Sequence, residues 1–369
     1  MAWKDTLKNN VNNVEQLQNF IDISVDEAKD YENIIKHFPL SSTTYYLDLI
    51  DPNDPDDPIR KMAVPTIDEF DISGDFDTSG ESQNTKMKGL QHKYSTTALL
   101  LSTNKCAMYC RHCFRKRLVG TSNNETLGFI NDAVDYIKAH TEINNVLITG
   151  GDSFLLENHL IESYLEALTE IDHIDFIRFG TRTPVVFPDR IYNDDELIGI
   201  LSKYSQKKKI YVVTQFNHPV ELSDEAMKAV NVLQDNNIIV NNQTVLLKGV
   251  NDSPTILATL QNELVKKGII PYYIFQCRPV RGVKNQFQLP LEVSLQLVED
   301  AKKMMHGHSK RIKFIMSHDS GKIEILGKFR GEMLFKYHQS KIAENAGKVF
   351  SVALTEHQAW LASTDIVLE

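Results

Sequence analysis

Short apolar runs alternate with amphipathic stretches along the middle of the chain, beginning near residue 97. Continuous apolar runs predict strands that are buried on both faces, and the amphipathic stretches predict helices that cover them, as over residues 129–137. Strands separated by helices in this way indicate parallel βα units. The predicted strands are residues 98–102, 146–149, 176–179, 210–214, 238–245 and 272–276, with a closing strand at 312–317.

Six such units predict an α/β fold, a partial (β/α)6 barrel similar to an incomplete TIM barrel, with its chemistry on the loops that follow the strands. A doubly wound open sheet is the alternative. Residues 1–88 are expected to be an N-terminal helical region and acidic linker, in which 66–88 are extended or flexible. Residues 89–325 would form the barrel core, and 326–369 a C-terminal extension that is helical or irregular from Gly331 onward.

Composition narrows the class of protein. The chain has 369 residues, 42% of them hydrophobic, which is enough for a large core. Lys and Arg number 40 against 49 Asp and Glu, a net charge of −9, so no surface for nucleic acid is expected. No apolar stretch approaches the ~20 residues that span a bilayer, and the N-terminus lacks the apolar core of a signal peptide. We therefore expect a cytoplasmic protein that binds no membrane.

Three of the four cysteines lie within eight residues, directly after the first predicted strand. Thiolates at Cys106, Cys110 and Cys113 would ligate three irons of a [4Fe–4S] cluster and leave the fourth iron open. This spacing is typical of radical S-adenosylmethionine enzymes. A structural zinc site normally has four ligands, and His112 lies between two of the cysteines, so zinc is the weaker alternative. Cys277 follows an apolar strand and is expected to be a lone buried thiol.

The segment Gly150-Gly151-Asp152 follows the second predicted strand. Glycines allow a backbone to approach a ligand closely, although Gly-Gly-Asp by itself is more often a tight turn. In a chain with this cysteine motif, it matches the segment that binds the amino group of S-adenosylmethionine.

Further motifs resemble those of lysine 2,3-aminomutase and its relatives, over a region from Trp3 to about Lys322. The motifs that carry the resemblance are residues 3–5, 45–55, 57–61, 110–117, 181–186, 216–219, 242–247, 249–252 and 271–273. The resemblance implies the partial barrel with an N-terminal helical region. It implies an isomerase that acts on a small-molecule amino acid, and it leaves a homo-oligomer open.

The chemistry implied by the resemblance begins with an electron from an external donor such as flavodoxin or ferredoxin. The reduced cluster would cleave S-adenosylmethionine to methionine and a 5′-deoxyadenosyl radical. That radical would take a hydrogen from the β-carbon of an amino acid bound to pyridoxal 5′-phosphate, and the amino group would move from the α-carbon to the β-carbon. The cofactors supply the chemistry, while the protein orients them.

The resemblance also implies roles for single residues. Arg115 would bind the substrate carboxylate, since a guanidinium can do so with two hydrogen bonds; a surface arginine is the alternative. Thr214, His218 and Gln243 would line the S-adenosylmethionine site, although His218 by itself could be an ordinary core histidine.

The pyridoxal phosphate machinery departs from the family pattern. Lys322 is the candidate lysine, but it follows one glycine in an apparently short loop where the family has several. Lys93 and Tyr94 would contact the phosphate, although one arginine of that anchor is missing. The zinc-binding cysteines of the family are also missing, since Ser253 stands at one such position and no Cys follows Cys277. We therefore predict no zinc.

Arg278 stands where the lysine enzyme has an Asp that pairs with the distal ammonium of the substrate. Ser317 or His318 stands where a second such Asp is expected. Free lysine is thus a poor candidate, and a dicarboxylic amino acid such as glutamate a better one, unless Arg278 pairs with Asp319 instead. Two other classes stay open: a radical enzyme without pyridoxal phosphate that acts on another small molecule or a peptide, and a non-catalytic iron–sulfur protein.

Overall fold

The computed structural model describes residues 2–121 and 124–368. Their contacts form two compact units, which are described separately. The first unit is Met1–Ile67, Ser82–Phe216 and Val220–Asn241, and the second is Asp68–Glu81, Asn217–Pro219 and Asn242–Glu369. The division expected from the sequence, at residues 88 and 325, stays a prediction.

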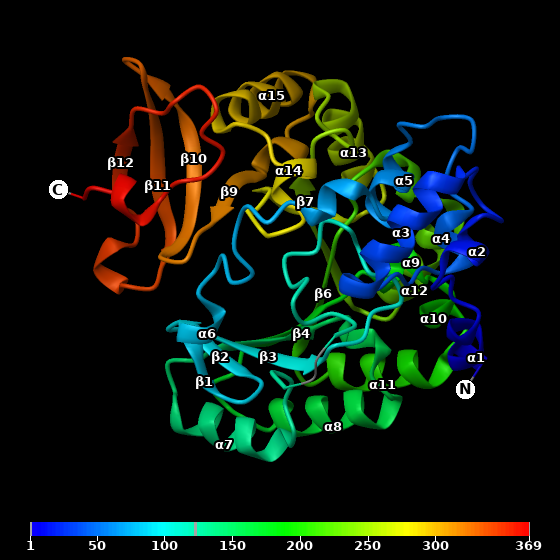
Figure 1. Ribbon diagram of the computed structural model, residues 1–369. Helices are drawn as coiled ribbons and strands as arrows, with labels where there is room; N and C mark the ends of the chain where they lie inside the picture. The colour runs from blue at the N-terminus through cyan, green and yellow to red at the C-terminus, as the bar shows by residue number, and fades with distance from the viewer. Residues whose placement is uncertain (1, 122–123, 369) are drawn as a thin grey trace. The chain divides into compact units, whose positions relative to one another are not determined.

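The first unit contains a mixed sheet (Figure 1). β1 and β2 join β3 in antiparallel pairs, whereas β3, β4, β5 and β6 pair in parallel, in the order of the sequence. Four of the predicted strands are therefore confirmed. The strands are β1 Thr85–Met87, β2 Leu90–Tyr94, β3 Thr97–Thr103, β4 Asn145–Gly150, β5 Phe176–Gly180 and β6 Lys209–Thr214.

Helices between these strands bury one apolar face each, as their periodicity predicts. On α8, Ile161, Leu165 and Leu168 are fully buried, and α8 packs between α7 and α11 (Figure 1). Each such side chain contributes roughly 1.5–3 kcal/mol by leaving water. The helices are α7 Ile130–Ala139, α8 Asn158–Thr169, α9 Thr183–Val186, α10 Asp189–Tyr192, α11 Asp195–Ser205 and α12 Asp224–Asp235, with the 3₁₀ turns η2 Ser153–Leu155 and η3 Pro219–Glu221.

The N-terminal region is helical, as expected, in short pieces. A capping box between Ser24 and Glu27 starts α3. Pro58 begins α5, where its missing N–H is no loss. The helices are α1 Ala2–Lys8, α2 Val14–Leu17, α3 Val25–His37, α4 Thr44–Leu47 and α5 Pro58–Ala63.

The longest segment of the second unit begins within β7 (Ile239–Leu246), whose first three residues belong to the first unit. β8 and β9 pair in parallel, and β9, β10, β11 and β12 continue as antiparallel neighbours (Figure 1). The elements are α13 Pro254–Lys266, β8 Ile270–Gln276, α14 Lys284–Phe287, α15 Leu291–Met304, η4 Ser309–Arg311, β9 Lys313–Ser317, β10 Gly321–Phe329, β11 Glu332–Ser340, η5 Ala343–Asn345, β12 Val349–Val352 and η6 Ser363–Asp365.

The prediction of a helical or irregular tail after Gly331 is wrong, because β11 and β12 extend the sheet. Their inward side chains Met333, Phe335, Tyr337 and Phe350 join the apolar core formed with α13 and α15. Burial of this alternating set outweighs the weak strand pattern of the segment.

The prediction of an extended or flexible linker at 66–88 is also wrong. The 3₁₀ turn η1 (Ile67–Phe70) and the helix α6 (Glu81–Asn84) form there. Within the second unit, Asp75 donates its N–H to the carbonyl of Pro279 (3.0 Å) and accepts the N–H of Arg281 (3.2 Å). These bonds hold the acidic segment beside the loop that follows β8.

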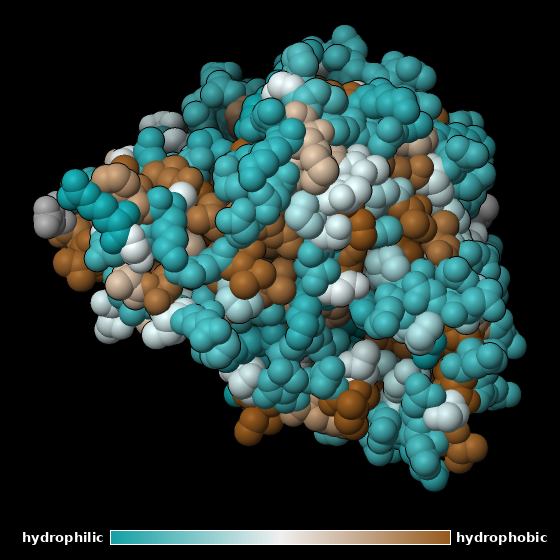
Figure 2. Space-filling view, turned by 90° about the horizontal axis from the view of Figure 1, so that it is seen from above, coloured by the Kyte–Doolittle hydropathy of each residue, from teal (hydrophilic) through white to brown (hydrophobic). Residues whose placement is uncertain are grey.

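The strand order follows the sequence from β1 to β12 and is not closed, so the fold is a partial barrel. A doubly wound sheet would reverse its order at a switch point. Among residues 2–121 and 124–368, no helix is long and apolar enough to cross a membrane. The face seen in Figure 2 is mostly hydrophilic, with apolar patches between the polar side chains.

Candidate active site

Cys106, Cys110 and Cys113 lie on the loop that follows β3, and all three are free, half-buried thiols. Burial raises the pKa of Cys113 to about 11 and that of Cys106 well above its usual range, and the neighbouring thiolates add to both shifts. Three thiolates this close therefore need a positive partner, which iron would supply. The donor set fits a [4Fe–4S] cluster with one iron open.

The N-terminal helical region holds the backbone of this loop. Its bonds to the loop connect groups far apart in the sequence, so they position the cysteines independently of the barrel strands. The bonds are Tyr109 N–H to the Ser41 carbonyl (2.8 Å), Arg111 N–H to the Met62 carbonyl (2.9 Å), and Asn10 Nδ2 to the Ala107 carbonyl (2.7 Å).

Gly150, Gly151 and Asp152 lie directly beside the start of the cysteine loop. Gly151 donates its N–H to the Thr103 carbonyl (2.6 Å), and Asp152 donates to the Lys105 carbonyl (2.8 Å). A Cβ on Gly151 would lie 2.3 Å from the Lys105 oxygen. The close approach that requires glycine here is therefore between two backbone segments.

The Asp152 carboxylate is buried and accepts three hydrogen bonds. The donors are Thr181 Oγ1 (2.5 Å), Arg182 N–H (2.8 Å) and Phe154 N–H (3.0 Å). Burial raises the pKa of Asp152, and these bonds offset the shift in part. The carboxylate thus links β4 to the loop after β5, and its contact with S-adenosylmethionine stays a prediction.

Replacing Gly151 by Ala should loosen the cysteine loop. The added methyl group would clash with a backbone oxygen, and relieving an overpacked contact costs about 1–3 kcal/mol. Gly199→Ala is the matched control, because its Cβ meets nothing within 4 Å on helix α11, where Ala is about 1 kcal/mol better than Gly. Both variants would be compared with the wild type by denaturant unfolding and by iron content per chain. Wild-type stability and iron in Gly151→Ala would contradict the packing argument.

Arg115 is buried beside the end of β4, which rules out a surface arginine. Its guanidinium contacts Thr149 Oγ1 at 3.5 Å and the Gly150 carbonyl at 3.4 Å, and it lies 4.6 Å from the centre of the Phe114 ring. Both polar contacts are long for hydrogen bonds. The structure therefore brings Arg115 together with Gly150 and the cysteine loop.

Thr214 ends β6 and is 1% exposed. Its Oγ1 has no hydrogen-bond partner among the residues that the structure describes. A buried hydroxyl without a partner is costly, so a polar ligand at this strand end would be favourable. This orphaned atom fits the predicted S-adenosylmethionine site.

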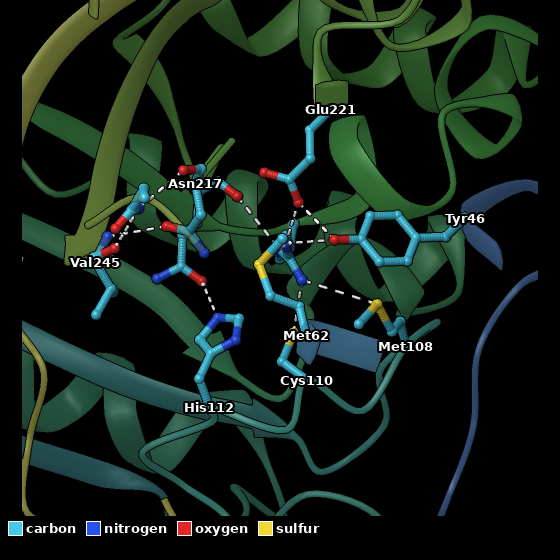
Figure 3. A network of polar contacts seen from close by, with 11 residues as sticks. Tyr46, Met62, Met108, Cys110, His112, Asn217, Glu221 and Val245 are labelled. Atoms are coloured by element: carbon cyan, nitrogen blue, oxygen red, sulfur yellow. Dashed lines mark hydrogen bonds and ion pairs between the residues drawn. The ribbon is translucent and has the colours of Figure 1, made fainter. Parts of the chain in front are cut away.

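His218 and Gln243 belong to the second unit. Gln243 lies half-buried on β7, and His218 follows Asn217, whose side chain accepts the N–H of Val245 at 2.9 Å (Figure 3). This bond ties the His218 segment to the end of β7. Their roles toward S-adenosylmethionine stay predictions.

His112 is buried and bonds through Nε2 to Gln215 Oε1 at 3.2 Å. Burial and the nearby Arg182 charge lower its pKa to about 3. The imidazole is therefore neutral, and one of its nitrogens is already engaged with the protein.

Sequence reasoning gave no role to Arg182, which reaches the cysteine loop. Its Nη1 donates to Cys110 Sγ at 2.9 Å, and its Nη2 contacts Tyr46 Oη at 3.1 Å and the Glu221 carboxylate. Figure 3 shows Tyr46, Glu221 and Cys110 facing one region. The rule that functional residues follow strand ends could have found it, because Arg182 follows β5 just as Gly151 follows β4.

In the second unit, Lys322 lies on β10 opposite Ser317 of β9, so their side chains share one face of the sheet. Lys322 Nζ donates to Gln339 Oε1 (3.0 Å) and lies 5.3 Å from the centre of the Tyr273 ring. Arg278 donates to Ser317 Oγ at 2.8 Å. The expected short loop is residues 318–320 between β9 and β10, and Lys322 follows it at the start of β10, near Arg278.

His318 lies in the loop between β9 and β10. It bonds to Ser320 and Asp319, and its ring lies 6.3 Å from that of Trp360. Asp319 pairs with His318 and Ser363 rather than with Arg278. Of the two residues considered at this position, Ser317 is therefore the one beside Arg278.

Lys93 and Tyr94 lie at the opposite end of β3 from the cysteines. Tyr94 pairs with Thr97, whereas the cysteine loop follows Thr103, about 20 Å along the strand at ~3.4 Å per residue. The structure does not bring them together with the cysteine loop, and their phosphate contact stays a prediction. Cys277 is a lone buried thiol, as expected, and burial raises its pKa to about 12.

Comparison with known proteins is consistent with this geometry. The profile of the Radical SAM superfamily matches residues 100–258. A protein named "Putative L-lysine 2,3-aminomutase" from Aquifex aeolicus (strain VF5) is 40% identical over 351 residues, 94% of each chain. The L-lysine 2,3-aminomutase of Clostridium subterminale is 37% identical over 83% of this chain and 72% of its own. The chain belongs to the lysine 2,3-aminomutase family of radical S-adenosylmethionine enzymes.

The family also contains a relative that acts on a different amino acid. The glutamate 2,3-aminomutase of Clostridioides difficile (strain 630) is 36% identical over 299 residues, 80% of this chain and 69% of its own. Membership of the lysine 2,3-aminomutase family makes the chain an isomerase that uses a [4Fe–4S] cluster and S-adenosylmethionine. The residues that fit the cluster are Cys106, Cys110 and Cys113.

Proposed function

We propose that this enzyme is a 2,3-aminomutase that binds pyridoxal 5′-phosphate on Lys322 and acts on an amino acid with a distal carboxylate. The observation that carries the proposal is the shared face of β9 and β10, where Lys322, Ser317 and Arg278 form one group. The opposite face carries Met316 and Ile323, which are buried in the apolar core. Polar side chains are thus kept for one side of the sheet.

Lys322 is proposed to be the residue that attaches the cofactor covalently. A lysine amine can bond a carbonyl only when it is unprotonated, and a restricted, partly apolar environment favours that form. Lys322 is half-buried against the Tyr273 ring. When bound, pyridoxal phosphate would supply the conjugated system needed for migration of the amino group.

Tyr273 is oriented by a neutral partner. Its hydroxyl bonds to His338 Nε2 at 2.8 Å. Burial lowers the pKa of His338, and the charges of Lys313 and Lys322 lower it further. The uncharged imidazole therefore adds no second cation beside Lys322 at neutral pH, and it fixes the phenol that packs against the lysine.

An arginine of the second unit would bind the substrate. Arg278 is proposed to bind the distal carboxylate, with Ser317 orienting the guanidinium. The relative that acts on glutamate supports a substrate of this class.

Borohydride reduction with pyridoxal phosphate should label Lys322 alone. The variant Lys322→Ala should lose the label and the visible absorbance of the bound cofactor. Lys313→Ala is the matched control, because Lys313 lies on the adjacent strand β9 and pairs with Glu324, and it should keep both. Peptide mapping by mass spectrometry is the measurement. Label on a different lysine would move the attachment site, and no label would favour a radical enzyme without pyridoxal phosphate.

A further inference from the structure

The Arg182 side chain divides its donors between a cluster cysteine and a buried anion. One terminal nitrogen donates to Cys110 Sγ at 2.9 Å, while the other bonds Glu221 and Tyr46. Nε donates to the Gln215 carbonyl at 3.1 Å. A carboxylate could accept both terminal nitrogens in a bidentate pair, so a purely structural ion pair would not require the sulfur contact.

The anion is itself held in place. Glu221 is fully buried and accepts a hydrogen bond from the Tyr46 hydroxyl at 2.6 Å. Arg182 is 8% exposed, and Met62 and Met108 sulfurs lie 3.8 Å from its nitrogens. A charge in such surroundings acts more strongly than the same charge in water. The guanidinium is thus a fixed, poorly screened cation against one ligand sulfur.

Hydrogen bonds to cluster sulfurs and the charge around a cluster set its reduction potential. Reduction adds one electron to the cluster, supplied by an external one-electron donor of the flavodoxin or ferredoxin class, and the cluster becomes more negative by one charge. A cation that donates a hydrogen bond to a ligand sulfur stabilises this reduced state more than the oxidised state. A nearby anion has the opposite effect.

We propose that Arg182 is a positioning residue that raises the reduction potential of the cluster through Cys110, with Glu221 and Tyr46 holding its guanidinium in place. The inference depends on the cluster alone and not on pyridoxal phosphate or the substrate. It can therefore fail, or hold, independently of the proposed function.

The test is a redox titration of anaerobically reconstituted full-length protein. The titration is monitored through the electron paramagnetic resonance signal of the reduced cluster. Arg182→Gln should lower the midpoint potential, with the equilibrium constant for reduction falling about tenfold, which is ~59 mV for one electron. Glu221→Gln should shift the potential upward, because it removes an anion and keeps the side-chain shape. Arg182 and Glu221 form one buried ion pair. Loss of structure is not expected to shift the reduction potential in opposite directions in the two variants.

Arg190→Gln is the matched control. Arg190 is also a fully buried arginine of the first unit, and it pairs with Asp194 and Asn158. The Arg190→Gln variant should have a lower melting temperature and an unchanged reduction potential. Equal potentials in wild type and Arg182→Gln, with four irons per chain in each, would overturn the proposal. If Arg182→Gln does not retain iron, the sign for Glu221→Gln decides, and no shift or a downward shift would overturn it.

Discussion

Replacement of any one of Cys106, Cys110 and Cys113 by Ala is expected to abolish the conversion of S-adenosylmethionine to 5′-deoxyadenosine. Three thiolates from one loop would ligate three irons, and the open fourth iron would bind the cofactor. Loss of one thiolate leaves a second iron without its protein ligand. Changes outside the ligand set of a metal site already cost 10–100-fold, so loss of a ligand should cost more than ~100-fold.

The measurement is 5′-deoxyadenosine formed by the reduced, anaerobically reconstituted protein, together with iron and sulfide content. Cys277→Ala is the control that removes a thiol of the other unit, and it should retain the cluster and the turnover. Full turnover in all three variants, or tight zinc without iron in the wild type, would contradict cluster ligation by this loop.

Reversal of the charge at Arg278 is expected to reverse the choice of substrate. A distal ammonium about 4 Å from a guanidinium costs ~4 kcal/mol at an effective dielectric near 20. At ~1.4 kcal/mol per factor of ten, the wild type should disfavour lysine relative to glutamate by roughly a thousandfold. Arg278→Asp should lose this preference, because the introduced carboxylate repels a distal carboxylate and attracts an ammonium.

Two further variants separate this effect from a general change of charge. Arg281→Asp alters an exposed arginine of the same loop and should keep the preference for glutamate. Ser317→Ala removes the hydroxyl that accepts from Arg278 and, at ~1 kcal/mol per hydrogen bond, should weaken the preference about fivefold. The readout is the β-amino acid product formed from each substrate. A wild type that prefers lysine would exclude Arg278 as a carboxylate ligand.

The barrel strands could be predicted because their signal is local. Each of the seven predicted strands forms, from β3 to β9, and all but β7 are largely apolar, as strands covered on both faces are. The cysteine motif could be recognised for a similar reason, because its three cysteines lie within eight residues. The rule that chemistry follows strand ends also picked out Gly151, Arg115 and Arg278, whose roles stay predictions.

The segments that the sequence described wrongly are those stabilised by distant partners. Residues 68–81 carry mostly acidic and turn-forming side chains, and their order comes from backbone bonds to residues 279–282. β11 contains charged residues among its apolar positions, and β12 is only four residues long. They become strands because β11 pairs with β10 and β12 pairs with β11, which buries Phe335 and Phe350. The local sequence pattern shows neither residues 279–282 as partners of residues 68–81 nor the neighbouring strands as partners of β11 and β12.

The sequence by itself determined the class of fold and the family and predicted the cluster ligands, since all three depend on spacing along the chain. Only the tertiary structure decided which side chains touch. Arg182 meets Cys110 across 72 residues, and Arg278 meets Ser317 across 39. Strand order places residues at one end of a sheet, but rotamers and packing decide their contacts. A hydrogen bond forms only when donor and acceptor are held within about 3 Å, and that condition is set by the fold as a whole.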